Sequence, residues 1–478
     1  MQLRTLDGVV IIGYLVLMLL IGIWGSIKTK NMEDYVVAGR RLGFGAMFPC
    51  MCALLLGGGC TLGGAGLGYT TGLSGVWFLI ALALGCAALT VIAPKVSRLR
   101  IYTIADMLEA RYGKASKMFG AVVVAVYLIA LATVQVVSVG AILSSLFGWD
   151  VKLAMLIGGG VGLLYSWIGG MFAVTITDIF QWIFMTVGVF FMLLPTSLSQ
   201  AGGFANLTAT LDPSYFDFMA IGGGGILAYI LLYTLGSPVD QSGWQRLFTA
   251  KNKKVAFWGT LATSGYAILW GFAIITIGMC AAVIMPGIEN SDSVFTLMTV
   301  RMLPAGLAGF VLAGALSAVM STLDGPFLAA STVIINDFVI PSCKTKPSDK
   351  KVLHWTRLCM AISGIIGLIV AFWLQEVLVA LDFAYEILAS SVVVPVFAGL
   401  FWKRANSKGA FTAIVAGLVG MIIGMVIWGI SSLYPILLGM GASLIAMIVV
   451  SLATPAESEK WDRLFSRTVE DTPEMTAQ

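Results

Sequence analysis

Long apolar stretches alternate with short polar segments along the chain. A helix needs about 20 apolar residues to cross the hydrocarbon core of a bilayer. Thirteen stretches approach or reach that length, near residues 7–27, 45–69, 73–95, 117–147, 152–168, 173–197, 221–243, 254–285, 304–335, 354–374, 377–401, 408–430 and 434–453. Of all residues 59% are hydrophobic and 11% are charged, whereas a soluble domain carries about 25% charged residues. The pattern predicts an all-α polytopic membrane protein with about thirteen transmembrane helices.

The basic residues are concentrated in alternate loops. All but three of the 28 Lys and Arg residues lie on one side of the predicted spans; the exceptions are Arg4, Lys152 and Arg301. Lys and Arg are enriched in cytoplasmic loops. This predicts a plasma-membrane protein whose N-terminus is outside and whose C-terminus is cytoplasmic. The spans form one membrane domain over residues 1–454, and residues 455–478 form a cytoplasmic tail too short for a domain.

The second predicted span contains an unusual number of glycines, nine of them between residues 53 and 75. Glycine costs about 1 kcal/mol per helical position relative to alanine. Two interpretations fit this run. The helix is broken there, because broken backbone at membrane depth is tolerated where it lines a cavity or an ion site. Alternatively, the small residues allow close packing of neighbouring helices.

A second interruption favours the first interpretation. Gly236, Ser237 and Pro238 fall inside the predicted span 221–243, and proline both lacks a helical donor and clashes with the preceding turn. Each interrupted segment begins a set of five spans, 45–197 and 221–401. Because five is odd, the second set starts from the opposite side of the membrane. This pattern predicts an inverted repeat, with a binding site where the broken helices meet.

Hydroxyl groups on the ninth span indicate a cation site. Ala318, Ser321 and Thr322 are spaced i, i+3 and i+4, so they share one helical face. Two hydroxyls and a backbone carbonyl suit a small monovalent cation. The alternative is that these hydroxyls bond to their own helix or to a neighbouring helix.

Two carboxylates lie inside or at the edge of predicted spans. A carboxylate at membrane depth is a functional-site hypothesis by default, and Asp178 and Asp324 are in such positions. No Lys or Arg is predicted at their depth, so a bound cation or a shared proton is expected to balance their charge. The alternative is a partly hydrated carboxylate at the membrane interface.

Other classes of function lack their motifs. None of the glycine clusters is followed by the Lys and Ser or Thr of a phosphate-binding loop, which argues against ATP-driven transport by this chain. The seven cysteines show no zinc or redox spacing. No nucleophile–base pair is visible. We therefore expect no enzymatic activity, no nucleic-acid partner and no obligate protein partner; the lipid bilayer is the expected surrounding.

Several motifs, in order, resemble those of the sodium:solute symporters with the LeuT-type fold. They are DYVVAGR (34–40), IADMLEARYG (104–113), SWIGGMFAVTITDIFQ (166–181), DQSGWQR (240–246), LAGALSAVMSTLD (312–324) and GLFWKRANSKGA (399–410). The resemblance implies a 5+5 inverted-repeat core with two discontinuous helices. It also implies symport of a small solute by alternating access, driven by Na⁺.

The resemblance also implies the ligands of the ion. A primary sodium site would use the carbonyls of Ala53 and Leu56 with the carbonyl of Ala318 and the hydroxyls of Ser321 and Thr322. Some members of the family have a second sodium site containing an aspartate that corresponds to Asp178. Its other ligands would fall on Ser321, Asp324 and Gly325, where an aspartate and a glycine replace hydroxyls. Whether Asp178 and Asp324 hold a second cation or a proton stays open.

The candidate solute-binding residues are mostly polar and partly acidic. They are Cys60, Thr61, Gln135, Asp240, Gln241, Asp382, Tyr385 and Glu386. Because no Lys or Arg is expected beside them, they favour an amine-bearing solute such as an amino acid. The alternative solute is a small carboxylate held by helix N-termini. The alternative for Asp382 and Glu386 is that they face an outer vestibule and touch no solute. Proton-coupled transport by Asp178 and Asp324 and a non-transporting membrane sensor are the competing functions.

Overall fold

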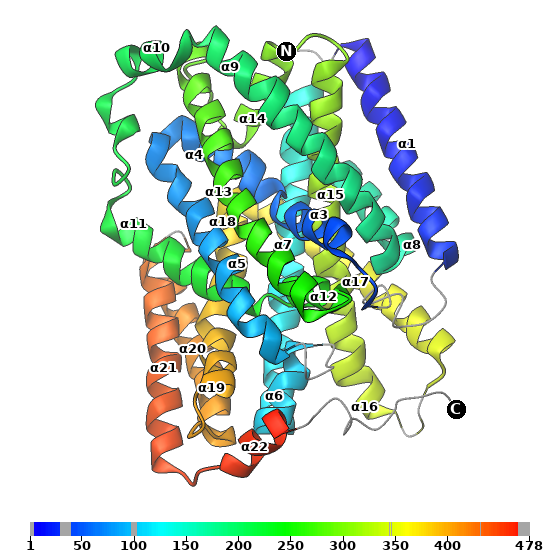
Figure 1. The fold of residues 1–478 in the computed structure, drawn as a ribbon, viewed down its shortest axis with the longest axis vertical. Helices are drawn as coiled ribbons and strands as arrows, with labels where there is room; N and C mark the ends of the chain where they lie inside the picture. Colours follow the sequence, from blue (N-terminus) through cyan, green and yellow to red (C-terminus); the bar gives the residue numbers. More distant parts are fainter. Residues whose placement is uncertain are drawn as a thin grey trace.

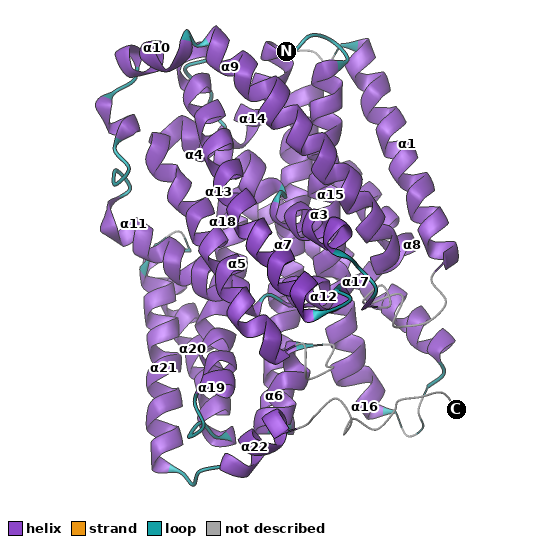
Figure 2. Ribbon diagram, viewed as in Figure 1, coloured by secondary structure: helices purple, strands orange, loops and turns teal. Residues whose placement is uncertain are grey.

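The protein is a bundle of helices (Figure 1), and its described residues contain no strand (Figure 2). The computed structural model describes residues 4–28, 40–96, 103–343, 345, 347–430 and 432–466. Within these residues, ten helical segments are long and apolar enough to cross a membrane. Three shorter apolar helices accompany them, Thr5–Met18, Phe44–Leu55 and Val151–Leu164. The all-α polytopic class is confirmed, while the count of thirteen spans stays a prediction.

Long helices form the frame of the bundle. They are α1 (Thr5–Lys28), α5 (Val76–Val96), α7 (Lys114–Phe147), α8 (Val151–Thr186), α13 (Lys253–Ile284), α15 (Leu307–Ile334), α17 (Asp349–Leu374), α20 (Ser407–Trp428) and α21 (Tyr434–Ala453). α7 and α15 are largely buried and pack against each other, whereas α17, α20 and α21 expose much of their apolar surface. α1 packs on α8 and α15, at the right edge of Figure 1. Continuous helices satisfy their own backbone groups, as a bilayer requires.

One predicted boundary is not tested. The predicted spans 152–168 and 173–197 both fall in the helical stretch made by α8, η4 (Val187–Leu193) and α9 (Leu194–Gln200). The side chains of residues 168–173, where the two spans would separate, lie outside the described residues. Two separate spans in this stretch stay a prediction.

The glycine run is a broken helix. α3 (Phe44–Leu55) ends, Leu56 and Gly57 leave the helix, and the chain resumes as η2 (Gly59–Gly63) and α4 (Gly64–Thr71). A Cβ at position 57 would lie 2.7 Å from Thr322 Oγ1. Only glycine therefore permits this closeness to α15. Both interpretations of the run apply here, since the helix breaks and its glycines also allow close packing.

The second interruption is also a break. α11 (Gly222–Tyr229) and η6 (Ile230–Thr234) approach it, η7 (Ser237–Val239) turns the chain, and α12 (Gln241–Thr249) follows. Asp240 caps α12, because its carboxylate accepts from the backbone N–H of Ser242 at 3.0 Å and of Gly243 at 2.9 Å. Both discontinuous helices predicted from the sequence are thus present.

Shorter elements complete the chain. They are η3 (Gly72–Gly75), α6 (Ile104–Tyr112), α10 (Gly203–Thr210), η5 (Pro213–Phe216), η8 (Ser291–Ser293), α14 (Val294–Met302), η9 (Ile335–Val339), α16 (Ile340–Ser342), α18 (Val377–Leu388), η10 (Ala389–Val393), α19 (Val394–Phe401) and α22 (Ser458–Ser466). The motif at 104–113 forms α6, which begins with a capping box between Thr103 and Asp106. α22 packs on α6, which places the start of the tail against the bundle.

Candidate functional site

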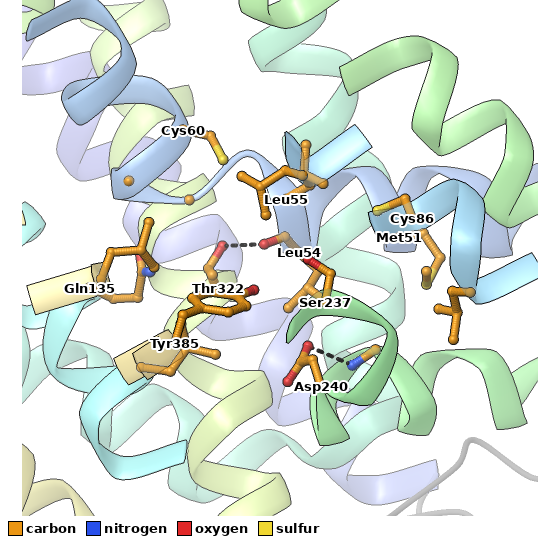
Figure 3. A pocket seen from close by; sticks show the side chains of 17 residues that line it. Met51, Leu54, Leu55, Cys60, Cys86, Gln135, Ser237, Asp240, Thr322 and Tyr385 are labelled. Atoms are coloured by element: carbon orange, nitrogen blue, oxygen red, sulfur yellow. Dashed lines mark hydrogen bonds between the residues drawn. The ribbon is translucent and has the colours of Figure 1, made fainter. Parts of the chain in front are cut away.

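A cavity of about 80 Å³ lies between the two breaks (Figure 3). Both broken helices line it, together with α5, α7, α15 and α18. Its polar lining residues are Cys60, Cys86, Gln135, Ser237, Asp240, Thr322 and Tyr385. Most of the remaining lining is apolar, including Leu131 and Leu381, and no described lining residue is basic. An apolar cavity with a few convergent polar groups is the usual form of a site for a small organic molecule.

The predicted sodium ligands from the two helices lie together. The hydroxyl of Thr322 is 3.2 Å from the carbonyl of Ala53 and 2.8 Å from that of Ala318. Ser321 Oγ is 3.5 Å from the same Ala318 carbonyl. One hydroxyl hydrogen cannot serve two carbonyls, so spare oxygen lone pairs converge here. Unwound carbonyls and hydroxyls are the groups with which transporters of this kind coordinate Na⁺.

Leu56 is placed differently from its predicted partners. Its carbonyl accepts the hydroxyl of Thr61 at 2.7 Å, across the break itself. Thr61 is buried and does not line the cavity. In this arrangement the Thr61 hydroxyl bonds across the break and stabilises its conformation. The roles of Leu56 as an ion ligand and of Thr61 beside the solute stay predictions.

The expectation that Asp178 lacks a basic partner is wrong. Arg246 Nη2 lies 3.3 Å from Asp178 Oδ2, and both side chains are fully buried. Cys50 Sγ also donates to Asp178 Oδ2, at 2.9 Å. In the sequence Arg246 lies five residues before the basic cluster at 251–254, and this pattern predicts a loop position for it. In the structure every residue of α12 is buried, so this end of the second broken helix packs inside the protein.

Arg246 joins four elements of the bundle. From α12 its Nε donates to the carbonyl of Cys50 on α3 at 3.2 Å, and its Nη2 pairs with Asp178 on α8. A Cβ at Gly325 on α15 would lie 2.7 Å from Arg246 Nη1. The glycine at 325 therefore makes room for the guanidinium. The predicted role of Asp324 is not tested, because its side chain lies outside the described residues.

Four of the predicted solute residues line the cavity, namely Cys60, Gln135, Asp240 and Tyr385. Gln135 Oε1 accepts the backbone N–H of Gly58 at 2.9 Å, which fixes the second half of the first broken helix against α7. Asp240 accepts the hydroxyl of Tyr127 at 3.0 Å besides capping α12. Its carboxylate thus stabilises the second break and also lines the cavity.

The other predicted solute residues lie elsewhere. Gln241 is buried, and its Oε1 accepts the backbone N–H of Ile104 at 2.7 Å. Asp382 and Glu386 border a separate cavity with Tyr229, although Tyr385 on the same helix faces the first cavity. Spacing along α18 alone could not separate these residues, because i, i+3 and i+4 positions share one broad face.

Three kinds of residue at the site could not be identified from the sequence pattern. Ser237 lines the cavity from inside the second break, and its position beside Pro238 was the available signal. Tyr127 orients Asp240 from a distant helix, and nothing in the local sequence identifies it. Leu131 and Leu381 shape the cavity, but apolar residues in an apolar span carry no distinguishing signal.

A family model decides the affiliation of the chain. The model described as "Sodium:solute symporter family" matches residues 35–417. The chain belongs to the sodium:solute symporter family. It is accordingly a multi-pass membrane protein that carries out Na⁺-coupled symport of a small solute, as the sequence predicted.

Curated relatives match over nearly their whole length. The high-affinity proline transporter PutP of Bacillus subtilis is 29% identical over 484 residues, covering 92% of this chain and 97% of the relative. The osmoregulated proline transporter OpuE of the same organism is 26% identical, covering 95% and 96%. A sodium/proline symporter of Staphylococcus aureus is 25% identical, covering 92% and 91%.

Solved structures share the fold. A Na⁺-coupled sialic acid symporter, in a substrate-bound outward-open state, aligns with a TM-score of 0.80 at 20% identity, covering 95% of this chain and 99% of that one. The nucleobase-cation-symport-1 transporter Mhp1, in a closed conformation, aligns with a TM-score of 0.57 at 16% identity, covering 92% and 99%. The LeuT-type fold with two discontinuous helices is thereby confirmed.

Proposed function

We propose that this symporter carries proline or a closely similar small amino acid. The observation that carries the proposal is full-length similarity to three curated relatives that are named for proline. The cavity supports it, because an apolar wall with few polar groups suits a compact, largely apolar amino acid. The alternative of a small carboxylate substrate lacks a fixed positive side chain among the lining residues.

In this proposal the break of the first helix serves both the ion and the solute. Na⁺ binds among the carbonyls of Ala53 and Ala318 and the hydroxyls of Ser321 and Thr322. Thr322 lines the solute cavity as well, so the ion and the solute share one wall. Na⁺ therefore ties α3 to α15 and orders the cavity that the solute enters. Its differential affinity for one state of the transporter shifts the population toward that state.

The second broken helix completes the solute site. Ser237 and Asp240 border the solute from this helix, with Cys60 from the first broken helix, Gln135 from α7 and Tyr385 from α18. The second half of the first broken helix begins at the break, and the positive end of a helix favours a carboxylate. Leu131 and Leu381 contact the apolar part of the solute.

Proton coupling through Asp178 is the weaker candidate. Arg246 balances the charge of Asp178 in this conformation, so Asp178 needs neither a second sodium ion nor a proton there.

We also propose that the N-terminus is outside and the C-terminus cytoplasmic in the plasma membrane, as the distribution of basic loops indicates. A fluorescent protein fused to the C-terminus should then be fluorescent, and a phosphatase fused there should be inactive.

Transport by the purified protein in proteoliposomes tests the proposal. An inward Na⁺ gradient should drive accumulation of radiolabelled proline, and replacement of Na⁺ by choline or K⁺ should abolish it. Unlabelled amino acids, quaternary amines and small carboxylates serve as competitors that define the solute. Accumulation that persists without Na⁺ would contradict sodium coupling, and accumulation that follows pH at constant Na⁺ would favour protons. Competition by carboxylates alone would contradict an amino-acid solute.

A further inference from the structure

A second and larger cavity lies beside the start of the second broken helix. Its volume is about 390 Å³, against about 80 Å³ for the cavity between the breaks. α11 and η6 form one wall, α18 forms another, and the loop between α20 and α21 lines it through Ile430, Ser432 and Leu433. Gly224 and Gly225 lie in the α11 wall, where the lack of side chains leaves space.

Two carboxylates from one face of α18 border this cavity. Asp382 and Glu386 are spaced i and i+4, so they lie one turn apart on that face. Asp382 accepts a hydrogen bond from the hydroxyl of Tyr233. Glu386 is only 1% exposed, and its Oε2 has no hydrogen-bond partner among the described residues. A buried carboxylate oxygen without a partner is costly, and buried charges are normally paired or bind a cation.

The rest of the lining provides no balancing charge. None of the described residues around the cavity is Lys, Arg or His. Tyr229 and Ser432 add neutral oxygen atoms to the two carboxylates. The cavity therefore has room, negative charge and an unpartnered acceptor, but no positive group of the protein.

We propose that this cavity is a cation site, in which Glu386 and Asp382 hold a monovalent positive group. Na⁺ and a small ammonium group share this chemistry. The site is separate from the sodium site at Thr322 and does not depend on the identity of the solute. A cation there links α11 to α18. Because η6 leads into the second break and Tyr385 of α18 lines the solute cavity, occupancy is expected to change solute affinity.

Carbodiimide labelling of the purified full-length protein tests the site directly. Dicyclohexylcarbodiimide modifies protonated carboxyl groups in apolar surroundings, and peptide mass spectrometry quantifies the adduct at Glu386. Three arms at equal ionic strength contain Na⁺, tetramethylammonium or the bulky N-methyl-D-glucamine. In the presence of a bound cation the labelling rate should fall about tenfold at ten times its dissociation constant, as mass action requires.

The arms distinguish the sources of the cation. Protection by Na⁺ alone identifies an alkali-metal site, protection by tetramethylammonium alone identifies an ammonium site, and protection by both identifies a site that accepts either. Equal labelling in all three arms would overturn the proposal, because Glu386 would then be a protonated structural residue. If no arm shows labelling, equal thermal unfolding temperatures in the three arms would overturn the proposal, because a cation that binds the folded protein must raise that temperature.

Variants separate this site from the proposed sodium site. Asp382→Asn should weaken protection of Glu386 at least severalfold, because one of two carboxylates is lost. Glu376→Gln removes an exposed carboxylate at the start of the same helix and should leave protection unchanged. Thr322→Ala should impair sodium-coupled transport and leave protection intact. Failure of sodium-coupled proline transport would therefore not imply failure of this site, or the reverse.

Discussion

Arg246 and Asp178 form an ion pair in which neither side chain is exposed, with 3.3 Å between Nη2 and Oδ2. The two residues are 68 positions apart and come from the second broken helix and from α8. Charges removed from water are tolerated only when they are paired and hydrogen-bonded. The pair therefore joins the second broken helix to α8, and loss of either partner leaves an unpaired buried charge.

Breaking this pair should destabilise the protein strongly. Asp178→Asn or Arg246→Gln alone should lower the free energy of unfolding by about 3–5 kcal/mol, because one buried charge is left unpaired. The double variant should recover much of that loss. Thermal unfolding in detergent provides the measurement. Lys403→Gln is the matched control, since Lys403 pairs with Asp462 at the surface, where such pairs contribute about 0–1 kcal/mol. Additive losses in the double variant would contradict coupling.

The same pair predicts the sodium dependence of transport. Because a guanidinium occupies the position beside Asp178, we expect only one coupling Na⁺. Uptake against sodium concentration should be hyperbolic, with a Hill coefficient of about 1, in Glu386→Gln, where a cation in the second cavity no longer contributes. Initial rates at saturating solute provide the measurement. A sigmoidal dependence with a coefficient near two would show that Arg246 does not replace a second ion.

Removal of a hydroxyl from α15 should weaken sodium binding. Thr322→Ala or Ser321→Ala should raise the sodium concentration for half-maximal uptake by roughly tenfold. The lost contact between the hydroxyl oxygen and Na⁺ is expected to contribute about as much free energy as one hydrogen bond. Protein amount should change little. Thr332→Ala is the control, because the Thr332 hydroxyl, further along the same helix, bonds the Leu328 carbonyl of its own turn at 2.8 Å. Equal effects at positions 322 and 332 would argue against a sodium site.

Gly57 should not tolerate even a methyl group. In Gly57→Ala the new Cβ would lie 2.7 Å from Thr322 Oγ1 and 2.8 Å from Thr322 Cγ2, so the break must move away from α15. Sodium-dependent uptake should fall at least tenfold. Gly45→Ala, in the first turn of the same broken helix, meets nothing within 4 Å and should retain uptake. Normal transport by Gly57→Ala would show that the close approach of Gly57 to Thr322 is dispensable.

Asp292 should make stability depend on pH in the acid range. This residue lies between α13 and α14, outside the spans, and burial raises its pKa from 3.8 to about 6, although its carboxylate accepts the N–H of Val377 at 3.0 Å. A raised folded-state pKa contributes stability below pH 4 that is lost as the pH rises through about 6. Two pKa units correspond to roughly 3 kcal/mol.

Comparison of unfolding at pH 4 and pH 7 checks this prediction. The loss of stability between these pH values should be smaller in Asp292→Asn than in the unsubstituted protein. Glu289→Gln, an exposed neighbour, should keep the original difference. If Asp292→Asn retains the full difference, other groups are responsible for it.

The membrane class, both helix breaks and the family could be predicted from the sequence because each depends on local or ordered features. Apolar length identifies spans, and the glycine run and the Gly236–Pro238 segment identified the two breaks, although Pro326 lies inside α15 without interrupting it. The face of Ala318, Ser321 and Thr322 could be predicted because helical periodicity places these residues together. The family resemblance predicted that these residues lie near Ala53. The geometry of that contact is known only from the packed helices.

Contacts between residues on different helices could not be predicted from the sequence. Arg246 looks like a loop cation because the basic residues at 251–254 follow it closely, and only the packing of α12 removes it from water. Asp382 and Tyr385 look alike in a spacing pattern, but they face different cavities. The physical reason is the same in each case. Periodicity and composition act within one helix, whereas burial and charge pairing depend on which helices meet, and that is decided only when the whole chain has packed.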